Sequence, residues 1–408
     1  MTKNKTRLYL LIILAVICLT IPWVVVRFGH FPLTPGIEVI LTGLAIVGAA
    51  FLISWGAEVA QFDVPRSFAL AGLALIAVLP EYAVDIYLAW EAGKNPSYIP
   101  YVSANMTGAN RLLVGLGWSL TVIFSWWAAR KKLNYKVNPA TYEVKLEKGL
   151  YVEFVFLTLA TLYCFVIPIK SRISLWDSLV LGLIYLGYLW FAFKSEYHEP
   201  EPKGPVELIA RLPKNWRRAV FCAMFVYAGF IIFIATKPFT ESLIMLGKTF
   251  GISEFLLIQW LAPIASESPE LIVIAYFALR GFSSSAMTAV ISSKINQWTL
   301  LIASLPIAYS LSHGSGSYLH LDPRPREEVL LTAAQSLFAV SVITNLRISL
   351  WEAMLLLILF VTQLFIPSMH VRYIYSGIYI LLGLIWLLKQ NKEFRNNLVS
   401  FLHTVRKK

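Results

Sequence analysis

Charged residues are scarce in this chain of 408 residues, because Asp, Glu, Lys and Arg together make up only 14% of it. A soluble domain averages about 25% charged residues, so the composition excludes an ordinary soluble protein. Cysteine is also rare: Cys18, Cys164 and Cys222 are the only three, and each lies in or beside an apolar run. Cysteines scattered in this way form neither a disulfide framework nor a metal-binding motif.

Catalytic motifs are missing as well. The sequence contains no paired Ser and His, no Gly-x-Gly-Asp motif and no His-Glu-x-x-His helix, and none of its six histidines is near the acids of the apolar runs. We therefore expect no enzyme and no cofactor. The first apolar run, residues 8–28, ends in WVVVRFGHF without a small-residue cleavage site, so we expect a retained helix rather than a signal peptide. The few long polar loops leave no room for a large soluble domain.

Long hydrophobic runs fill the chain instead. Hydrophobic residues make up 58% of it, and the mean hydropathy is +0.66. An apolar run of about 20 residues is long enough to cross a bilayer as a helix. We therefore predict an all-α polytopic membrane protein with about twelve transmembrane helices. The predicted spans are residues 8–28, 36–60, 66–90, 98–129, 148–168, 174–194, 217–245, 253–279, 284–312, 328–345, 349–367 and 373–389.

The net charge of +12 is explained by topology. Basic residues collect before the first predicted span and after the fourth, the sixth and the twelfth. With twelve spans and both ends inside, all of these clusters lie on one side, as expected for cytoplasmic loops. We expect an integral protein of a prokaryotic cell (inner) membrane with both termini in the cytoplasm. Its partners are the lipid bilayer and inorganic cations, and neither nucleic acid nor a protein partner is implied.

The sequence repeats itself internally. RISLWD (172–177) recurs as RISLWE (347–352), and AVLPEYAVDIYLAWEAG (77–93) resembles SESPELIVIAYFALRG (266–281). The order of the predicted spans implies that the two halves run through the membrane in opposite directions. Many secondary transporters with interrupted central helices have this arrangement. We predict two inverted five-helix repeats with one extra helix at each end. The expected segments are an N-terminal helix (1–30), a first half (36–194), a cytoplasmic linker (195–216), a second half (217–367) and a C-terminal helix with a basic tail (371–408).

Each repeat places a Pro-Glu pair inside an apolar span: Pro80 with Glu81, and Pro269 with Glu270. Proline lacks a backbone N–H, so it should free carbonyl oxygens of the preceding turn, near residues 76–77 and 265–266, for a cation. A carboxylate at this depth is costly unless it is paired, protonated or ion-bound. A structural pair with an intramembrane base is the alternative. Two further acids lie one turn from these glutamates, Asp85 and Glu267.

The spans that follow supply neutral oxygens. Ser103, Asn105, Thr107 and Asn110 lie in the fourth span, and Ser292, Ser293, Asn296 and Gln297 in the ninth. Together with carboxylates they would form the all-oxygen site that Ca²⁺ and Na⁺ prefer, although small polar residues also join membrane helices without binding ions. Two bases, Arg111 and Lys294, lie in the same spans. Four acids minus two bases leave about −2, which matches one divalent cation, two monovalent cations or two protons.

These motifs resemble those of the cation/calcium exchanger superfamily, in the manner of sodium/calcium exchangers. That family carries two inverted repeats with the motifs G-T-S-x-P-E and G-N-x-x-G-S-N. AVLPE (77–81), ANMTGAN (104–110) and ASESPE (265–270) retain parts of both. The resemblance covers residues 36–367 and implies that Glu81, Glu270 and Asn105 bind the ion. In the second repeat Glu267 replaces a hydroxyl residue, and either Ser293 or Lys294 is the counterpart of Asn105.

The sequence therefore predicts a secondary active cation antiporter, exchanging Ca²⁺ for Na⁺ or H⁺ by alternating access. A Na⁺/H⁺ antiporter with coupling through Lys294 and Glu267 is one alternative, and a cation channel or ion-regulated membrane scaffold is another. The transported ions are Ca²⁺, Na⁺ or H⁺. The predicted ion ligands are Glu81, Asn105, Ser266, Glu267, Glu270 and Ser293, and the predicted coupling or accessory residues are Asp85, Asn110, Lys294, Asn296, Gln297 and Arg111.

Overall fold

The computed structural model describes residues 3–64, 76, 78–132, 137–146, 150–193, 204–364 and 368–406. Helices make up nearly all of it, and the chain divides into two compact units. The first unit contains Met1–Tyr87 and Ala192–Glu270, and the second contains Leu88–Phe191 and Leu271–Lys408. Each unit thus combines segments from both halves of the sequence.

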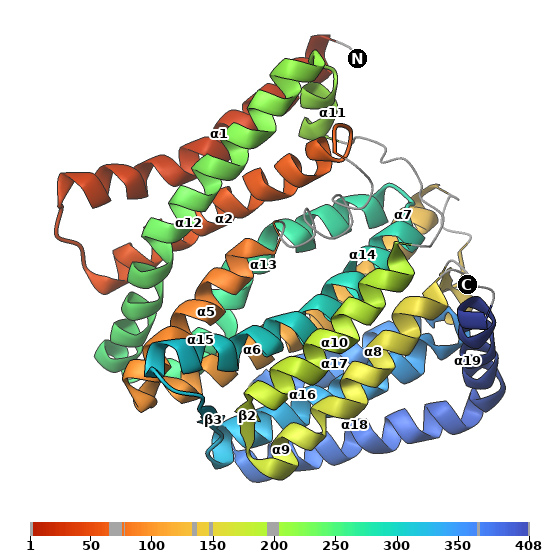
Figure 1. The fold of residues 1–408 in the computed structure, drawn as a ribbon. Coiled ribbons are helices and arrows are strands. Elements are labelled where there is room, and N and C mark those ends of the chain that lie inside the picture. Colours follow the sequence, from red (N-terminus) through yellow and green to blue (C-terminus); the bar gives the residue numbers. More distant parts are fainter. Residues whose placement is uncertain are drawn as a thin grey trace. The chain divides into compact units, whose positions relative to one another are not determined.

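The first unit is built on three long helices, α1 (Lys3–Gly29), α2 (Pro35–Ala60) and α12 (Lys214–Phe250), with the short helix α11 (Pro205–Ala210) beside them (Figure 1). Small residues of α2 allow close packing. A Cβ on Gly48 would lie 2.9 Å from the carbonyl oxygen of Val16 in α1, and one on Gly56 would lie 2.8 Å from the Phe225 ring in α12. The same unit holds the start of α5 (Leu79–Lys94) and most of α13 (Glu254–Leu279).

The second unit surrounds α16 (Pro323–Val342), which is buried along nearly its whole length. This helix packs against α18 (Met369–Lys389), α6 (Ile99–Leu112) and α8 (Tyr151–Cys164) (Figure 1). The remaining helices of the unit are α7 (Ser119–Lys132), α9 (Val166–Lys170), α10 (Leu175–Ala192), α14 (Ser283–Asn296), α15 (Ile302–His313), α17 (Leu350–Leu364) and α19 (Asn391–Arg406). Its short 3₁₀ turns are Pro96–Tyr98, Pro139–Thr141 and Ile343–Asn345.

Two spans of the second unit each contain a π-helical segment. Leu113–Trp118 joins α6 to α7, and Gln297–Leu301 joins α14 to α15. Such segments carry an extra residue in the helix and are frequent at functional sites. Both follow the helices on which the sequence predicts ion-binding amides and hydroxyls, so the two repeats share this irregularity as well as their motifs.

Four short strands confirm the inverted repeat. Strand β2 (Arg172–Ser174) pairs antiparallel with β3 (Tyr318–His320), and β4 (Arg347–Ser349) pairs antiparallel with β1 (Glu143–Lys145). The repeated RIS triplets are β2 and β4, and each one pairs with a strand from the other half of the sequence. Ser171 and Leu346 precede the triplets in left-handed conformation, with φ of 54° and 55°.

The residue that ends each repeated hexapeptide caps the following helix. The Asp177 carboxylate accepts from the backbone N–H of Ser174 at 2.7 Å, and the Glu352 carboxylate accepts from that of Ser349 at 2.9 Å. Each acid thereby satisfies a backbone donor that the first turn of a helix leaves unpaired. The repeated sequence therefore encodes the same strand-to-helix junction twice, once at the start of α10 and once at the start of α17.

The predicted fold class is confirmed. Within the described residues, nine helices are long and apolar enough to cross a membrane, and Leu350–Leu364 is a shorter apolar helix. Each of the twelve predicted spans contains a helix, and the first part of the third, residues 66–75, lies outside the described residues. The basic tail contains a helix that the sequence did not predict, α19, whose Phe394 ring lies 5.6 Å from that of Phe154 in α8.

Candidate functional site

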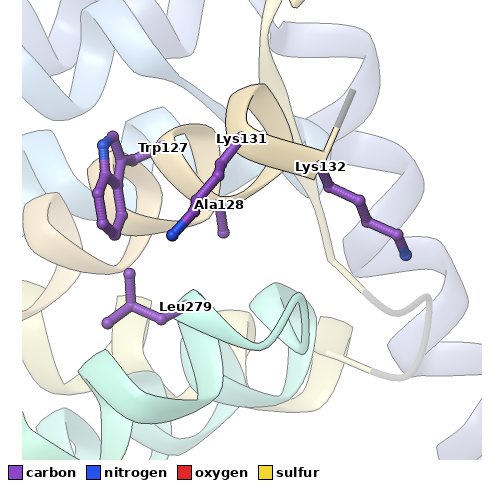
Figure 2. A pocket seen from close by; sticks show the side chains of 5 residues that line it. All are labelled: Trp127, Ala128, Lys131, Lys132 and Leu279. Atoms are coloured by element: carbon purple, nitrogen blue, oxygen red, sulfur yellow. The ribbon is translucent and has the colours of Figure 1, made fainter. Parts of the chain in front are cut away.

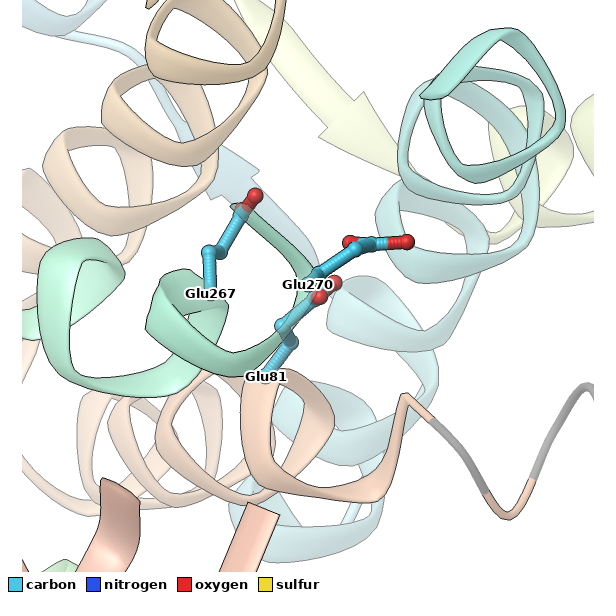
Figure 3. Close-up of side chains that lie close together, drawn as sticks. All are labelled: Glu81, Glu267 and Glu270. Atoms are coloured by element: carbon cyan, nitrogen blue, oxygen red, sulfur yellow. The ribbon is translucent and has the colours of Figure 1, made fainter. Parts of the chain in front are cut away.

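Three glutamates meet in the first unit. Each of Glu81, Glu267 and Glu270 offers a carboxylate oxygen, and these oxygens all lie within 4.8 Å of one another (Figure 3). Glu81 is 5% exposed and Glu267 is fully buried, whereas Glu270 is partly exposed. The two Pro-Glu pairs, far apart in sequence, thus bring their carboxylates together, and Glu267 adds a third.

Glu81 lies in the first turn of α5. Pro80 is the second residue of this helix, where a missing N–H costs nothing. The first backbone hydrogen bond of the turn runs from the Tyr82 N–H to the Val78 oxygen at 3.2 Å. Carboxylates are favoured at a helix N-terminus because unpaired N–H groups and the helix dipole are positive there. Ala77, where a freed carbonyl was predicted, lies outside the described residues.

Glu267 and Glu270 lie three residues apart on α13 and therefore share a helix face. The structure differs from the expected interruption here, because α13 continues through both Pro263 and Pro269. The Ser266 hydroxyl donates within its own helix, 3.3 Å from the Ala262 oxygen and 3.4 Å from the Pro263 oxygen, and it keeps lone pairs for a ligand.

The spacing of the carboxylates suits a divalent cation. Ca²⁺ binds oxygens at about 2.3–2.6 Å, so two ligands of one ion lie no more than about 5 Å apart. The three glutamate oxygens meet this limit. Three ionised carboxylates at such distances repel one another, and either a cation or protons must balance them. Asp85, one turn after Glu81, is buried in α5 but does not belong to this group.

The predicted residues of the second unit form a cluster of their own. Lys294 of α14 donates from Nζ to Oδ1 of Asn110 at 2.7 Å and to the Asn110 backbone oxygen at 3.3 Å. Its ammonium group also lies 4.2 Å from the centre of the Trp298 ring. The Asn110 amide in turn donates to the Gln297 carbonyl at 3.5 Å. Asn105, Ser293 and Asn296 are buried in the same helices.

Arg111 belongs to an ionic network that the sequence analysis missed. Its guanidinium lies 2.6 Å from the Glu328 carboxylate of α16, and both side chains are fully buried. Glu328 also pairs with Arg372 of α18 and, at 3.0 Å, with Arg324. Two features of the sequence could have revealed this network. They are a Glu-Glu pair at the edge of an apolar span and an arginine at the start of the last span. Arg111 therefore has a structural partner of its own within the second unit.

A hollow of the second unit has the opposite character to the glutamate cluster. It measures about 350 Å³ and is lined by Trp127, Ala128, Lys131, Lys132 and Leu279 (Figure 2). Two lysines and no acid line it, so its charge disfavours a cation. The glutamate cluster is accordingly the candidate cation site among the described residues.

Comparison with known proteins shows the family of the chain. A family model described as sodium/calcium exchanger protein matches residues 33–194 and 220–369. A crystal structure of the H⁺/Ca²⁺ exchanger CAX is 44% identical in sequence and superimposes with a TM-score of 0.92. That match covers 99% of this chain and 100% of the other. A comparison with curated protein sequences gave no match.

Two more distant structures share the fold. Native YfkE is 16% identical, with a TM-score of 0.58, and the match covers 91% of this chain and 100% of that one. The sodium-calcium exchanger NCX_Mj is 17% identical, with a TM-score of 0.52, and the match covers 82% and 99% of the two chains. At such identities the similarity concerns the architecture alone.

Proposed function

We propose, from the premise that the chain belongs to the sodium/calcium exchanger family, that it exchanges Ca²⁺ for H⁺ across its membrane. The protein is an integral membrane antiporter of the cation/calcium exchanger class. The choice of proton as the second ion is supported by the 44% identity to an H⁺/Ca²⁺ exchanger. We further propose that the membrane is a prokaryotic cell membrane and that both termini are cytoplasmic, following the distribution of basic loops.

The observation that carries this proposal is the group of three glutamates, Glu81, Glu267 and Glu270. When Ca²⁺ binds, the carboxylates are ionised and their oxygens coordinate it. When Ca²⁺ leaves, the repulsion between like charges is relieved by protons. Either occupant neutralises most of the charge, and a neutral site moves between the two faces of a bilayer at far lower cost than a charged one. The exchange of one occupant for the other is thereby coupled.

Other ligands complete the proposed site. Ca²⁺ takes six to eight oxygens, and three carboxylates with one or two oxygens each do not always reach that number. The Ser266 hydroxyl lies one residue before Glu267 on the same helix and is buried. Asn105 and Ser293 remain proposed ligands, and Asp85 remains a proposed accessory acid.

Flux into proteoliposomes tests the proposal. Vesicles containing the purified protein receive ⁴⁵Ca²⁺ outside while an outward H⁺ or Na⁺ gradient is imposed in turn. We expect uptake driven by the H⁺ gradient and collapse of that uptake when a protonophore dissipates it. Glu270→Gln should abolish uptake, whereas Glu254→Gln, an acid at the far end of the same helix, should retain it. Full transport by Glu270→Gln would refute the site.

A second candidate is Na⁺/H⁺ exchange with Lys294 as a coupled base. It is favoured by one observation: Lys294 is 1% exposed, and its ammonium group donates to Asn110 and lies over the Trp298 ring. A buried ammonium of this kind competes with a bound monovalent cation by charge. In the same vesicles, ²²Na⁺ uptake driven by H⁺ without added Ca²⁺ would favour this candidate over Ca²⁺/H⁺ exchange.

A further inference from the structure

An apolar groove opens in the first unit between α1, α2, α11 and α12. Its volume is about 550 Å³. The hydroxyls of Tyr227 in its lining and of nearby Thr20 lie 2.6 Å apart and hydrogen-bond each other, so Tyr227 has a partner already. A groove of this kind offers dispersion contacts and no polar anchor. The lining residues are Leu10, Ile13, Ile17, Leu52, Leu208, Ile209, Leu212, Val220, Ala223, Met224 and Tyr227.

Basic residues surround one end of this groove. On α1, Arg7 precedes the lining residue Leu10 by three positions and therefore shares its helix face. On the turn between α11 and α12, Arg211 and Lys214 flank the lining residue Leu212. Arg7 and Lys214 are both exposed. The groove thus runs from a cationic end into an apolar interior.

Only part of this positive charge has a partner. Arg211 pairs with Glu207 at 2.7 Å, and Arg217 pairs with Asp63 at 2.6 Å. Arg7 and Lys214 form no ion pair with any described residue, although the charge of Lys214 acts on the nearby Asp63 carboxylate. An exposed indole, Trp216, stands next to them and is 68% exposed. Tryptophan and basic residues together are typical of the level at which lipid headgroups lie.

We propose that this groove binds one anionic phospholipid, with an acyl chain between α1, α11 and α12 and the phosphate against Arg7 and Lys214. Charge complementarity selects the occupant. Juxtamembrane basic residues attract anionic headgroups, and basic pockets beside membrane helices hold them. Each methylene of the acyl chain that leaves water or loosely packed lipid for the apolar lining stabilises the complex. A zwitterionic lipid fills the groove equally well but gains less from the charges of Arg7 and Lys214 because it has no net charge.

The bound lipid would join α11 to α1 and α12. The helix α11 has only six residues, which is too short for a stable helix on its own. Val206 and Ile209 of α11 are buried, and Leu208 and Ile209, with Leu212 just after the helix, line the groove. An acyl chain there supplies the second apolar surface that this short helix lacks. Lipid composition would then affect the order of this end of the first unit.

Lipid retention by the purified full-length protein tests the proposal. Delipidated protein in detergent is mixed with equal amounts of phosphatidylglycerol and phosphatidylcholine of identical acyl chains, and bound lipid is counted by native mass spectrometry. We expect one phosphatidylglycerol retained in preference to phosphatidylcholine. The double variant Arg7→Gln, Lys214→Gln should lose at least about tenfold of that preference, since each basic residue contributes about fivefold. The control variant Lys392→Gln, Arg395→Gln removes the same charge elsewhere and should keep the preference.

A second pair of variants tests the apolar interior. Ala223 lines the groove and is exposed, so Ala223→Phe fills the groove without entering the core. This variant should lose retention of both lipids, whereas Cys222→Phe, the exposed neighbour outside the lining, should keep it. Glycerol phosphate added instead of lipid should not raise the thermal unfolding temperature; if it does, the site binds a free phosphate. Equal retention by all variants, or a dimer that Ala223→Phe dissociates, would overturn the proposal.

Discussion

Glu328 is the residue whose loss should destabilise the protein most. Its carboxylate lies 2.6 Å from Arg111 and 3.0 Å from Arg324, and it also pairs with Arg372. The substitution Glu328→Gln keeps the shape of the side chain and removes its charge. Glu327, the neighbouring acid of α16, is buried and has no hydrogen-bond partner among the described residues, so it forms none of the direct contacts that Glu328 makes.

The magnitude follows from burial. The side chains of Arg111 and Arg372 are 0% and 1% exposed, whereas Arg324 is 26% exposed and remains hydrated. Breaking a buried ion pair by removing one partner costs about 3–5 kcal/mol, because the remaining charge stays buried without compensation. An exposed pair costs about 1 kcal/mol or less. Glu328→Gln should therefore lower the free energy of unfolding by about 3–5 kcal/mol.

Unfolding in detergent micelles with increasing sodium dodecyl sulfate, followed by circular dichroism, measures this difference. Glu207→Gln is the matched control, because Glu207 pairs with Arg211 at 2.7 Å on the surface. The double variant Glu328→Gln, Arg372→Gln should recover part of the loss, since it removes one of the two stranded charges. If Glu328→Gln unfolds within about 1 kcal/mol of Glu207→Gln, the network does not hold the second unit together and the reasoning is refuted.

Three further outcomes are expected. Lys294→Ala should change both ion selectivity and the pH dependence of transport in proteoliposomes; if neither changes, the lysine is structural. Gly115→Ala should destabilise the protein by about 1–3 kcal/mol, because the new Cβ would lie 2.2 Å from the Phe360 ring. In the same unfolding assay Gly182→Ala should be neutral, because no atom lies within 4 Å of the new Cβ. A hydrogen bond from Arg217 lowers the pKa of Asp63 in the folded protein. The Arg217–Asp63 pair therefore stabilises the protein fully above the unfolded pKa of Asp63, which is about 4. This stabilisation is lost as the pH falls through the folded pKa. Asp63→Asn should therefore unfold more easily at pH 7 and show a smaller further loss of stability between pH 5 and pH 3; an unchanged acid profile would contradict this.

The sequence predicted those parts of the fold that local rules determine. Apolar runs of sufficient length identified the spans, and the hexapeptides at 172–177 and 347–352 identified the repeat. Each hexapeptide contains its own cap, a serine followed three residues later by an acid. The structure then forms the same junction twice because all of the required groups lie within the repeated segment. The pairing of each strand with the opposite half was not encoded locally and was not predicted.

The ionic network escaped prediction because its members come from three different helices. Glu328 lies in α16, Arg111 in α6 and Arg372 in α18. From the sequence, an arginine inside a membrane span was expected to lie near the predicted acids of the ion site. Only the packing of the helices shows which carboxylate pairs with Arg111. The same limit applies to α13. Pro269 favoured an interrupted helix, but α13 continues through Pro263 and Pro269, and the sequence alone does not reveal this continuity.

The two repeats keep their structural junctions alike while their acids differ, and this asymmetry bears on the proposed exchange. Equal spacing from the Pro-Glu pairs places Glu267 opposite Val78, which is buried and apolar. One repeat thus contributes one carboxylate and the other contributes two. Two carboxylates would balance one Ca²⁺, whereas three leave one negative charge beside the bound ion. On the proposed mechanism that charge must be met by a proton or a basic side chain, so Glu267 gives the Ca²⁺-loaded site a dependence on pH that a symmetric pair of glutamates would lack.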